Sequence, residues 1–190
     1  MINYKLLNDS IEFYNSKGFS RIEVPWMVTE YVDSLTRPKD AIPYRVENKK
    51  KNFIASGEQG FLYLYLKEYL PKGRFQAITP CMRNDTFDYT HTKYFMKNEL
   101  IITDDVSWKS VQDITEYALE FFRGIFGSEI KRISLTNGYD IEYKGIELGS
   151  YGIRECDFLK WIYGTGCAEP RTSRLLNQIN IKEWDTTKKK

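Results

Sequence analysis

The chain has 190 residues, which is enough for one domain with a substantial core and too few for two comfortable ones. Its hydrophobic content of 42%, charged content of 28% and net charge of +2 are ordinary for a globular protein and exclude a strong overall field for nucleic acid or membrane. The three cysteines lack metal-ligand spacing, the single histidine excludes a histidine-rich metal site, and with no secretory leader or membrane span in the sequence we expect a cytoplasmic protein.

The first part of the chain predicts helices, strands and one long loop. Residues 4–17 carry an apolar stripe that ends at Gly18 and predicts a helix. Residues 19–28 alternate apolar and polar side chains and predict a strand, in which Pro25 indicates an edge position or a strand end. Residues 36–51 are rich in Pro, Asp and Lys and predict a long loop, and the sequence leaves open whether it closes over a substrate. A short strand, a turn at residues 56–57 and a helix ending before Pro71 follow.

The second part predicts strands around one clear helix. Residues 74–82 and 93–103 predict an antiparallel hairpin with a polar loop, and residues 108–126 predict the clearest amphipathic helix. Residues 131–137 and 139–155 add strands, and residues 164–176 read as a turn that leads into a closing helix. This order favours an α+β fold with a mostly antiparallel sheet flanked by helices. We expect a single domain over residues 1–182 and a basic tail over residues 183–190.

Arg83 and Phe95 are the first pair of candidate functional residues, because they flank the loop of the predicted hairpin. An arginine binds phosphate oxygens through a planar fork, and an aromatic ring offers its face to a base. The two side chains could therefore hold opposite ends of a nucleotide. On these residues alone, the alternative of an exposed hairpin arginine and a core phenylalanine stays open.

Asp140 and Glu147 are the second pair, seven residues apart with Gly145 between them. If Gly145 forms a turn, the two carboxylates approach each other and, with triphosphate oxygens, suit magnesium. Two unrelated surface acids are the alternative. Arg154 follows Glu147 by another seven residues and either points a cation into the same cleft or bridges a neighbouring acid at the surface.

Three segments, taken in order, resemble the three motifs of the class II aminoacyl-tRNA synthetases. "SIEFYNSKGFSRIEVPWMV" resembles motif 1, a helix and strand whose proline, here Pro25, lies at a dimer interface. "AITPCMRNDTFDYTHTKYFMKNE" resembles motif 2, and "GTGCAEPR" resembles motif 3. Each match is weak alone, but their order and context make them specific together. The resemblance covers about residues 4–180, implies a class II synthetase/biotin ligase-like catalytic domain, and is closest to the aspartyl/asparaginyl branch.

The resemblance implies a nucleotide site built from motifs 2 and 3. Arg83 would bind the α-phosphate and the carboxylate of the amino acid, and Phe95 would stack on adenine. Arg171 would cover the other face of adenine and meet the γ-phosphate. His91 would lie beside the triphosphate, and Asp85, where the family usually has glutamate, would lie near the adenine edge.

The resemblance also implies a metal site and an amino acid site. Magnesium would lie among three carboxylates, those of Glu99, Asp140 and Glu147. The amino acid would be held by the segment "SGEQ" and by an arginine that contacts an aspartate- or asparagine-like side chain, a set made up of Ser56, Glu58, Gln59 and Arg154.

Together these roles imply a minimal synthetase that uses ATP and Mg²⁺ to form an aminoacyl adenylate. Motif 1 predicts a homodimer through an apolar patch of Phe19, Val24 and Trp26 around Pro25. No segment resembles an anticodon-binding domain, so we expect a stand-alone core and leave open whether tRNA, a protein or a small molecule accepts the acyl group. Two other functions stay open, namely a non-catalytic paralogue acting as a dimeric regulatory or accessory protein, and an amide-forming biosynthetic ligase.

Overall fold

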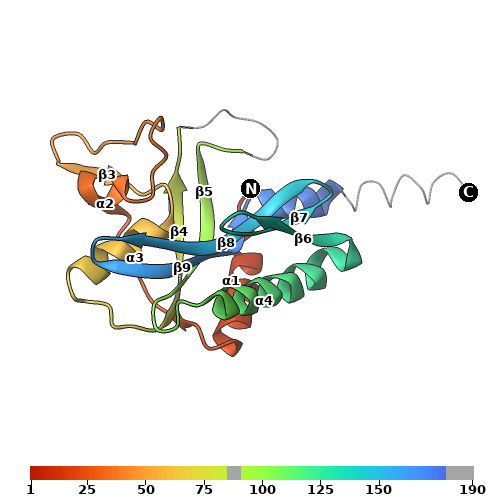
Figure 1. The fold of residues 1–190 in the computed structure, drawn as a ribbon. Helices are drawn as coiled ribbons and strands as arrows, with labels where there is room; N and C mark the ends of the chain where they lie inside the picture. Colours follow the sequence, from red (N-terminus) through yellow and green to blue (C-terminus); the bar gives the residue numbers. More distant parts are fainter. Residues whose placement is uncertain (85–90, 179–190) are drawn as a thin grey trace, which may run out of the picture.

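A seven-stranded sheet forms the centre of the computed structural model, which describes residues 1–84 and 91–178 (Figure 1). The strand order is β1-β4-β5-β9-β8-β7-β6, and each neighbouring pair is antiparallel except β1 and β4, which are parallel. A separate pair, β2 and β3, forms a small antiparallel sheet. The predicted α+β fold with a mostly antiparallel sheet flanked by helices is therefore confirmed.

The elements follow one another in an order that puts the long strands after α3. The strands are β1 (Ser20–Arg21), β2 (Met27–Thr29), β3 (Lys51–Phe53), β4 (Arg74–Met82), β5 (Tyr94–Ile102), β6 (Ile130–Leu135), β7 (Gly138–Tyr143), β8 (Ile146–Cys156) and β9 (Leu159–Glu169). The helices are α1 (Tyr4–Ser16), α2 (Glu30–Ser34), α3 (Gly57–Leu66), α4 (Trp108–Phe126) and the 3₁₀ turn η1 (Gly127–Glu129). The chain is helical again over residues 171–178.

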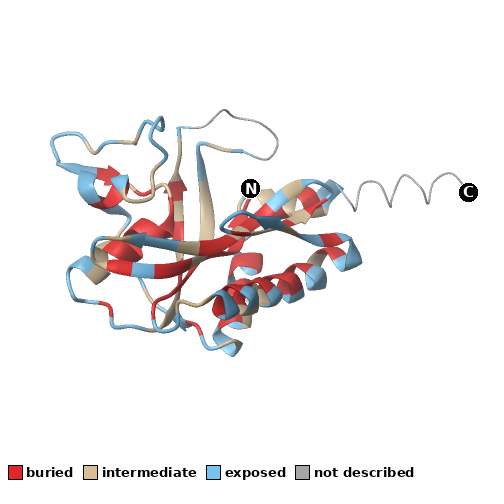
Figure 2. Ribbon diagram, viewed as in Figure 1, coloured by how far each residue is buried: buried red, intermediate tan, exposed pale blue. Residues whose placement is uncertain are grey.

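Two apolar cores cover the two faces of the sheet. Alternate side chains of β5 point into one core or the other. Leu100 and Ile102 point into a core formed with α1 and α4, whereas Ile101 points into a second core formed with α3. Successive side chains of a strand leave on opposite faces, so one strand serves both cores. Figure 2 shows the buried residues along the inward faces of these helices and through the central strands. The functional face of the sheet is the one that carries α3.

The helices α1 and α4 begin at the capping residues that their sequences supply. Asn3 accepts a hydrogen bond from the Leu6 N–H, and Ser107 accepts one from the Ser110 N–H. Such caps satisfy amide groups that have no partner within the helix. The apolar stripes then pack together, with the rings of Phe13 and Phe121 5.4 Å apart. No helix in residues 1–84 and 91–178 is long and apolar enough to cross a membrane.

The predicted strand over residues 19–28 is wrong. Only the ends of this segment pair with other strands, in β1 and β2, and Pro25 lies between them without an N–H to donate to a ladder. The dimer patch predicted here also changes, because Phe19 and Val24 are buried in the cores of the subunit itself. Trp26, at 53% exposure, is the member of that patch that faces solvent.

The turn expected within residues 164–176 does not include Gly164 or Gly166, because both lie inside β9. A Cβ atom at Gly164 would lie 2.8 Å from the Tyr151 ring and 2.9 Å from Ile114. The glycine is thus required by close packing under the sheet rather than by a turn. The helical segment starts only after Pro170.

Candidate active site

Two adjoining cavities lie on the face of the sheet that carries α3. The larger encloses about 510 Å³ and is bordered by α2, residues 36–43, the start of α3, and strands β5, β8 and β9. The smaller encloses about 60 Å³ and lies where the end of β9 and the start of the helix at residue 171 meet β5. Both cavities share four wall residues, Arg83, Lys97, Glu147 and Thr165. They therefore form one cleft with two ends, which we call, after the ligands that the sequence resemblance implies for them, the nucleotide end (the smaller) and the amino acid end (the larger).

The nucleotide end brings together the motif 2 and motif 3 residues that the sequence singled out. The guanidinium carbon of Arg83 lies 5.0 Å from the centre of the Phe95 ring, and Arg83 Nε donates to the carbonyl oxygen of Ala55 over 3.0 Å. Phe95 is half-buried in the cavity wall and is not a core residue. His91 lines the same wall. The predicted position of Asp85 lies outside the described residues.

Arg171 lines the same cavity as Arg83. It leaves the first turn of the helical segment 171–178, and its Nη1 donates to the backbone oxygen of Glu147 over 3.0 Å. The same Nη1 lies 3.6 Å from Glu147 Oε1. Two arginines that line one small cavity provide a complementary charge for an anion such as a phosphate chain.

A β-bulge places Glu147 on the cleft. In a regular strand, residues seven apart point to opposite faces, so Glu147 and Arg154 would not share one cavity. The pairing of β7 with β8 shifts by one residue between Ile141 and Glu142, which leaves Leu148 as the extra residue. Glu147, Ser150 and Arg154 consequently all line the amino acid end.

The three carboxylates predicted to bind magnesium do not gather into one group. Among residues 1–84 and 91–178, no three His, Cys, Asp or Glu side chains lie close enough together to hold a metal ion. Glu99 is buried and already engaged, because Ser56 Oγ donates to its Oε2 and Lys97 Nζ lies 2.8 Å from its Oε1. Glu99 therefore does not fit the role of a metal ligand.

Asp140 and Glu147 fit a metal role better. The Oδ1 atom of Asp140 is buried and has no hydrogen-bond partner within the described part of the chain. Partial burial raises the pKa of this carboxyl above its ordinary value, a hydrogen bond with Ser150 opposes that rise, and like-charge repulsion from Glu147 adds to it. A cation between these carboxylates would remove both penalties, and hard oxygen ligands suit Mg²⁺.

The amino acid end has a floor of paired charges. Glu58, only 3% exposed, accepts a hydrogen bond from Trp161 Nε1 over 2.6 Å and one from Arg154 Nη1. Burial raises the pKa of the Glu58 carboxyl, whereas the Arg154 charge opposes that rise. The guanidinium of Arg154 also lies 4.1 Å from the centre of the Tyr163 ring. Arg154 thus bridges neither neighbouring acid of its own strand but is paired to Glu58.

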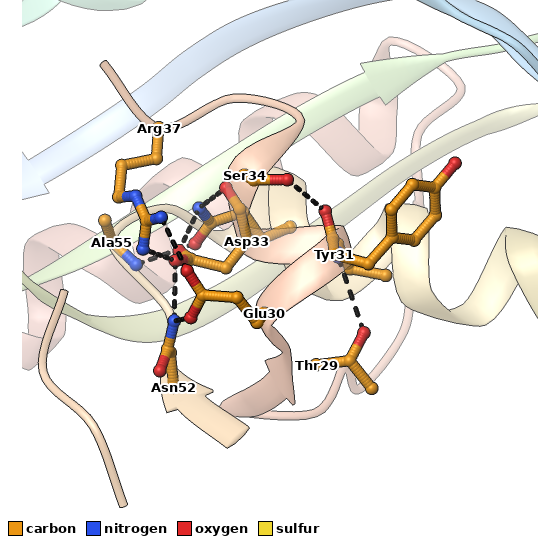
Figure 3. Close-up of polar contacts among 10 residues, drawn as sticks. Thr29, Glu30, Tyr31, Asp33, Ser34, Arg37, Asn52 and Ala55 are labelled. Carbon is orange, nitrogen blue, oxygen red and sulfur yellow. Dashed lines mark hydrogen bonds and ion pairs between the residues drawn. The ribbon is translucent and has the colours of Figure 1, made fainter. Parts of the chain in front are cut away.

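Gln59 borders the larger cavity, and its side-chain amide is engaged within the chain. Its Nε2 donates to Asp33 Oδ1 over 2.7 Å and to the Asp33 backbone oxygen over 3.0 Å, and its Oε1 accepts from the Ala55 N–H over 2.8 Å. These contacts join α3 to Asp33 of α2 and to Ala55, which are labelled in Figure 3. Ser56 and Glu58 of the segment "SGEQ" also line the amino acid end, together with Arg154.

Sequence reasoning missed three residues that shape the site. Lys97 lies two residues before Glu99 in the predicted hairpin strand, so strand alternation puts both on one face and could have revealed the pair. Trp161 and Asp33 carried no such signal. Their contacts to Glu58 and Gln59 join residues 103 and 26 positions apart, which no local pattern encodes.

Residues 56–183 match the family model described as tRNA synthetases class II core domain (F). The chain belongs to this family. The family match covers more than half of the chain and contains the segments that resemble motifs 2 and 3, so the resemblance is confirmed at the level of the class II core.

Individual relatives of this class II core protein are serine–tRNA ligases. The enzymes of Sulfurisphaera tokodaii and Sulfolobus acidocaldarius are each 24% identical over 200 residues, covering 96% of this chain and 41% of theirs. The chain thus spans about two fifths of the curated relatives it matches. The predicted closeness to the aspartyl/asparaginyl branch is therefore wrong, since the "YD…E…R" pattern on which it rested is carried by a chain similar to seryl enzymes.

Solved structures of synthetases share the fold. Seryl-tRNA synthetase from Pyrococcus horikoshii, complexed with ATP, superimposes with a TM-score of 0.70 at 17% identity, over 90% of this chain and 48% of that one. Pyrrolysyl-tRNA synthetase from Desulfitobacterium hafniense gives a TM-score of 0.70 at 17% identity, over 92% of this chain and 69% of that one. At this identity the likeness establishes the class II fold and nothing finer.

Proposed function

We propose that this class II core activates a small, uncharged amino acid with ATP to form an aminoacyl adenylate. One observation carries the proposal: Arg83 and Arg171 line a cavity that adjoins a larger one, whose wall holds the buried and paired carboxylates of Glu58 and Glu99. A polyanion suits the first end and an amino group suits the second. Such a division of charge fits ATP and an amino acid placed head to head.

The chemistry that this arrangement would perform is an in-line displacement. A carboxylate oxygen of the amino acid attacks the α-phosphorus of ATP, a P–O bond forms, and the bond to the leaving pyrophosphate breaks. The attacking and leaving groups are both anionic, so the main tasks are to hold them in line and to neutralise their charge. Arg83 lies at the junction of the two ends and would bind the α-phosphate together with the attacking carboxylate. Phe95 and Arg171 would hold the adenine between them.

Asp140 and Glu147 would hold Mg²⁺ beside the phosphates. When bound, the ion would neutralise phosphate charge and help to orient the leaving pyrophosphate. Glu99 would instead keep Lys97 and Ser56 in place next to the substrate amino group, because its two oxygens are engaged by these residues.

The amino acid end favours a small and neutral side chain. Arg154 shares its charge with Glu58 and stacks on Tyr163, so its cation is already neutralised from inside the protein. An acidic substrate would have to compete with Glu58 for it. Relatives named as serine–tRNA ligases point the same way, and serine is the first amino acid to test.

The assembly and the acceptor are the last parts of the proposal. Trp26, Met27 and Tyr31 are exposed on one side of β2 and α2, and covering such side chains in a homodimer around Pro25 would remove apolar surface from water. The 3′ end of a tRNA is the acceptor suggested by the relatives' names. Sedimentation would test the dimer, and transfer of labelled serine to total tRNA would test the acceptor.

The activation step is tested by ATP–pyrophosphate exchange against a panel of single amino acids. We expect exchange with serine or another small amino acid, and none with aspartate. Binding of ATP without exchange for any member of the panel would contradict the proposal and would favour the non-catalytic alternative.

A further inference from the structure

A buried polar network joins α2 to the start of α3, next to the amino acid end (Figure 3). Its centre is Asp33, which is 1% exposed although it is an acid. Arg37, one helical turn later, lies against Asp33 and leads into residues 38–43 of the cleft wall. A fully buried acid next to a substrate cleft requires an explanation, because burial of a carboxylate is costly unless every oxygen is engaged.

Every oxygen of Asp33 is engaged by a different element. Its Oδ1 accepts from Gln59 Nε2 of α3 over 2.7 Å. Its Oδ2 accepts from Asn52 Nδ2 of β3 over 2.8 Å and is paired with Arg37 Nη1. Glu30 closes the outer side, with Arg37 Nη2 2.7 Å from its Oε1. The network thus gathers α2, β3 and α3 on one carboxylate.

Asp33 and Gln59 both border the larger cavity, and contacts lead from Asp33 through Gln59 to the backbone at Ala55. Both amide donors of Gln59 point at Asp33, so its Oε1 is turned toward the Ala55 N–H, 2.8 Å away. Ala55 in turn offers its carbonyl oxygen to Arg83 Nε. Ser56, the next residue, donates to Glu99. The orientation of the Gln59 amide therefore fixes the backbone position of Ala55 and Ser56, at the edge of the amino acid end.

A role in stability alone does not account for these contacts. α2 has only five residues, and its apolar contact with the rest of the chain is made by Val32, which is fully buried. A buried ion pair stabilises a fold no better than apolar residues of similar volume, so its presence is weak evidence for stability. The charge of Asp33 instead fixes the orientation of the Gln59 amide. A carboxylate between Arg37 and Gln59 only accepts hydrogen bonds, so the N–H groups of Gln59 must point toward it.

We propose that Asp33 is a positioning residue for the amino acid end of the cleft, acting through Gln59 on Ala55 and Ser56. This inference rests on the proposed function, because it takes the larger cavity to be the amino acid subsite. It assigns to Asp33 a larger effect on amino acid affinity than on ATP affinity, because Asp33 reaches Arg83 only through the backbone at Ala55. Residues that merely stabilise the fold would change both together.

The test measures dissociation constants for serine and for ATP by calorimetry in wild-type protein and in Asp33→Asn. In this variant the N–H groups of the new side-chain amide at position 33 point at the N–H groups of Gln59, Asn52 or Arg37, which donate to the carboxylate in the wild type. We expect the dissociation constant for serine to rise by about tenfold or more, as for loss of one satisfied buried group, while that for ATP changes by less than about threefold. Amide hydrogen exchange at residues 55–59 should become faster in the same variant.

A charge swap supplies the second variant and guards against a simple failure to fold. Gln59→Glu alone sets two carboxylates against each other and should weaken serine binding at least as much as Asp33→Asn. In the double variant Asp33→Asn with Gln59→Glu, the new amide at position 33 donates to the new carboxylate at position 59, while the amide oxygen still faces Arg37 and Asn52. We expect the double variant to bind serine more tightly than either single variant, a coupling measured by the cycle of the four proteins.

Asp113→Asn is the matched control, because Asp113 pairs with Lys109 at the same spacing of four residues but on the exposed face of α4. It should leave both affinities unchanged. Unchanged serine affinity in Asp33→Asn, equal losses for serine and ATP, or no recovery in the double variant would each overturn the positioning role. If the wild-type protein binds ATP but no amino acid, the proposed function is contradicted, and the positioning role with it. This outcome is measured on the wild-type protein before any variant is made.

Discussion

The two ends of the cleft are built in opposite ways. At the amino acid end two buried carboxylates are paired within the chain, with Glu58 held by Arg154 and Trp161, and Glu99 held by Lys97 and Ser56. At the nucleotide end the carboxylate nearest the arginines is half-exposed, and Arg171 rests 3.6 Å from an oxygen of this residue, Glu147. The carboxylates of the amino acid end are held in place before any substrate binds. The nucleotide end instead has two cations, Arg83 and Arg171, in the wall of its cavity.

This difference follows from what each end would bind. An amino group is small and is recognised by a few fixed carboxylate oxygens, so a rigid floor reduces the entropy lost on binding. A triphosphate carries several charges and brings its own counter-ion, so it is best met by cations on several elements. We therefore expect substitutions at the nucleotide end to act on chemistry and ATP, and those at the amino acid end to act on selectivity.

Arg83→Ala should have the largest effect, because Arg83 lies where the two ends meet and would contact both reacting groups. Loss of one preorganised donor to the reacting centre costs about 10²–10³ in kcat. The measurement is the rate of pyrophosphate exchange at saturating ATP and amino acid. Arg132→Ala, which removes an exposed arginine paired with Glu116, is the control and should leave the rate unchanged. A loss of less than about threefold in Arg83→Ala would contradict this placement.

Phe95→Ala should have a smaller effect, confined to the nucleotide end. Stacking of a base on an aromatic ring is worth about 1–3 kcal/mol, so ATP should bind roughly 5- to 150-fold more weakly. The dissociation constants of ATP and serine, measured by calorimetry, separate the two ends. Phe95→Tyr keeps the ring and should restore most of the affinity. If serine binding weakened as much as ATP binding, the division of the cleft into two ends would be wrong.

Glu58→Gln should have the smallest effect, visible in the pH dependence of stability. Burial raises the pKa of Glu58 above its ordinary value of 4.5, so between these two values the folded state binds more protons than the unfolded state. The contribution of Glu58 to the free energy of unfolding therefore falls as pH rises from about 4.5 through the folded-state pKa. Urea titrations at several pH values should show that the wild type loses stability relative to Glu58→Gln over this window. A constant difference would mean that Arg154 fully offsets the burial.

Local patterns in the sequence were enough to predict most elements. The boundaries predicted for β4 and α4 are those observed, since each has a clear period and is bounded by turn or capping residues. The strand predicted from the alternation over residues 19–28 did not form there, because Val24 packs against α3. A Cβ atom at Gly60 of α3 would lie 2.7 Å from the Val24 side chain. In that segment tertiary contact replaced strand pairing.

The site was predictable only where its residues lie in motifs. Arg83, Phe95 and Arg171 were found because their spacing belongs to recognisable segments, and the structure brings them to one cavity. The pairing of Glu58 with Arg154 and Trp161 was not predictable from the sequence, because it joins residues about 100 positions apart. The bulge at Leu148, which turns Glu147 into the cleft, depends on the register of two strands and has no signature in one of them.

The central claim is that the two ends of the cleft act together to join an amino acid to AMP. The most direct measurement is exchange of labelled pyrophosphate into ATP by the wild-type chain, with Mg²⁺ and each amino acid in turn. The account predicts exchange that requires a small neutral amino acid, with serine first, and that is lost in Arg83→Ala. Bound ATP with no exchange for any amino acid would contradict it.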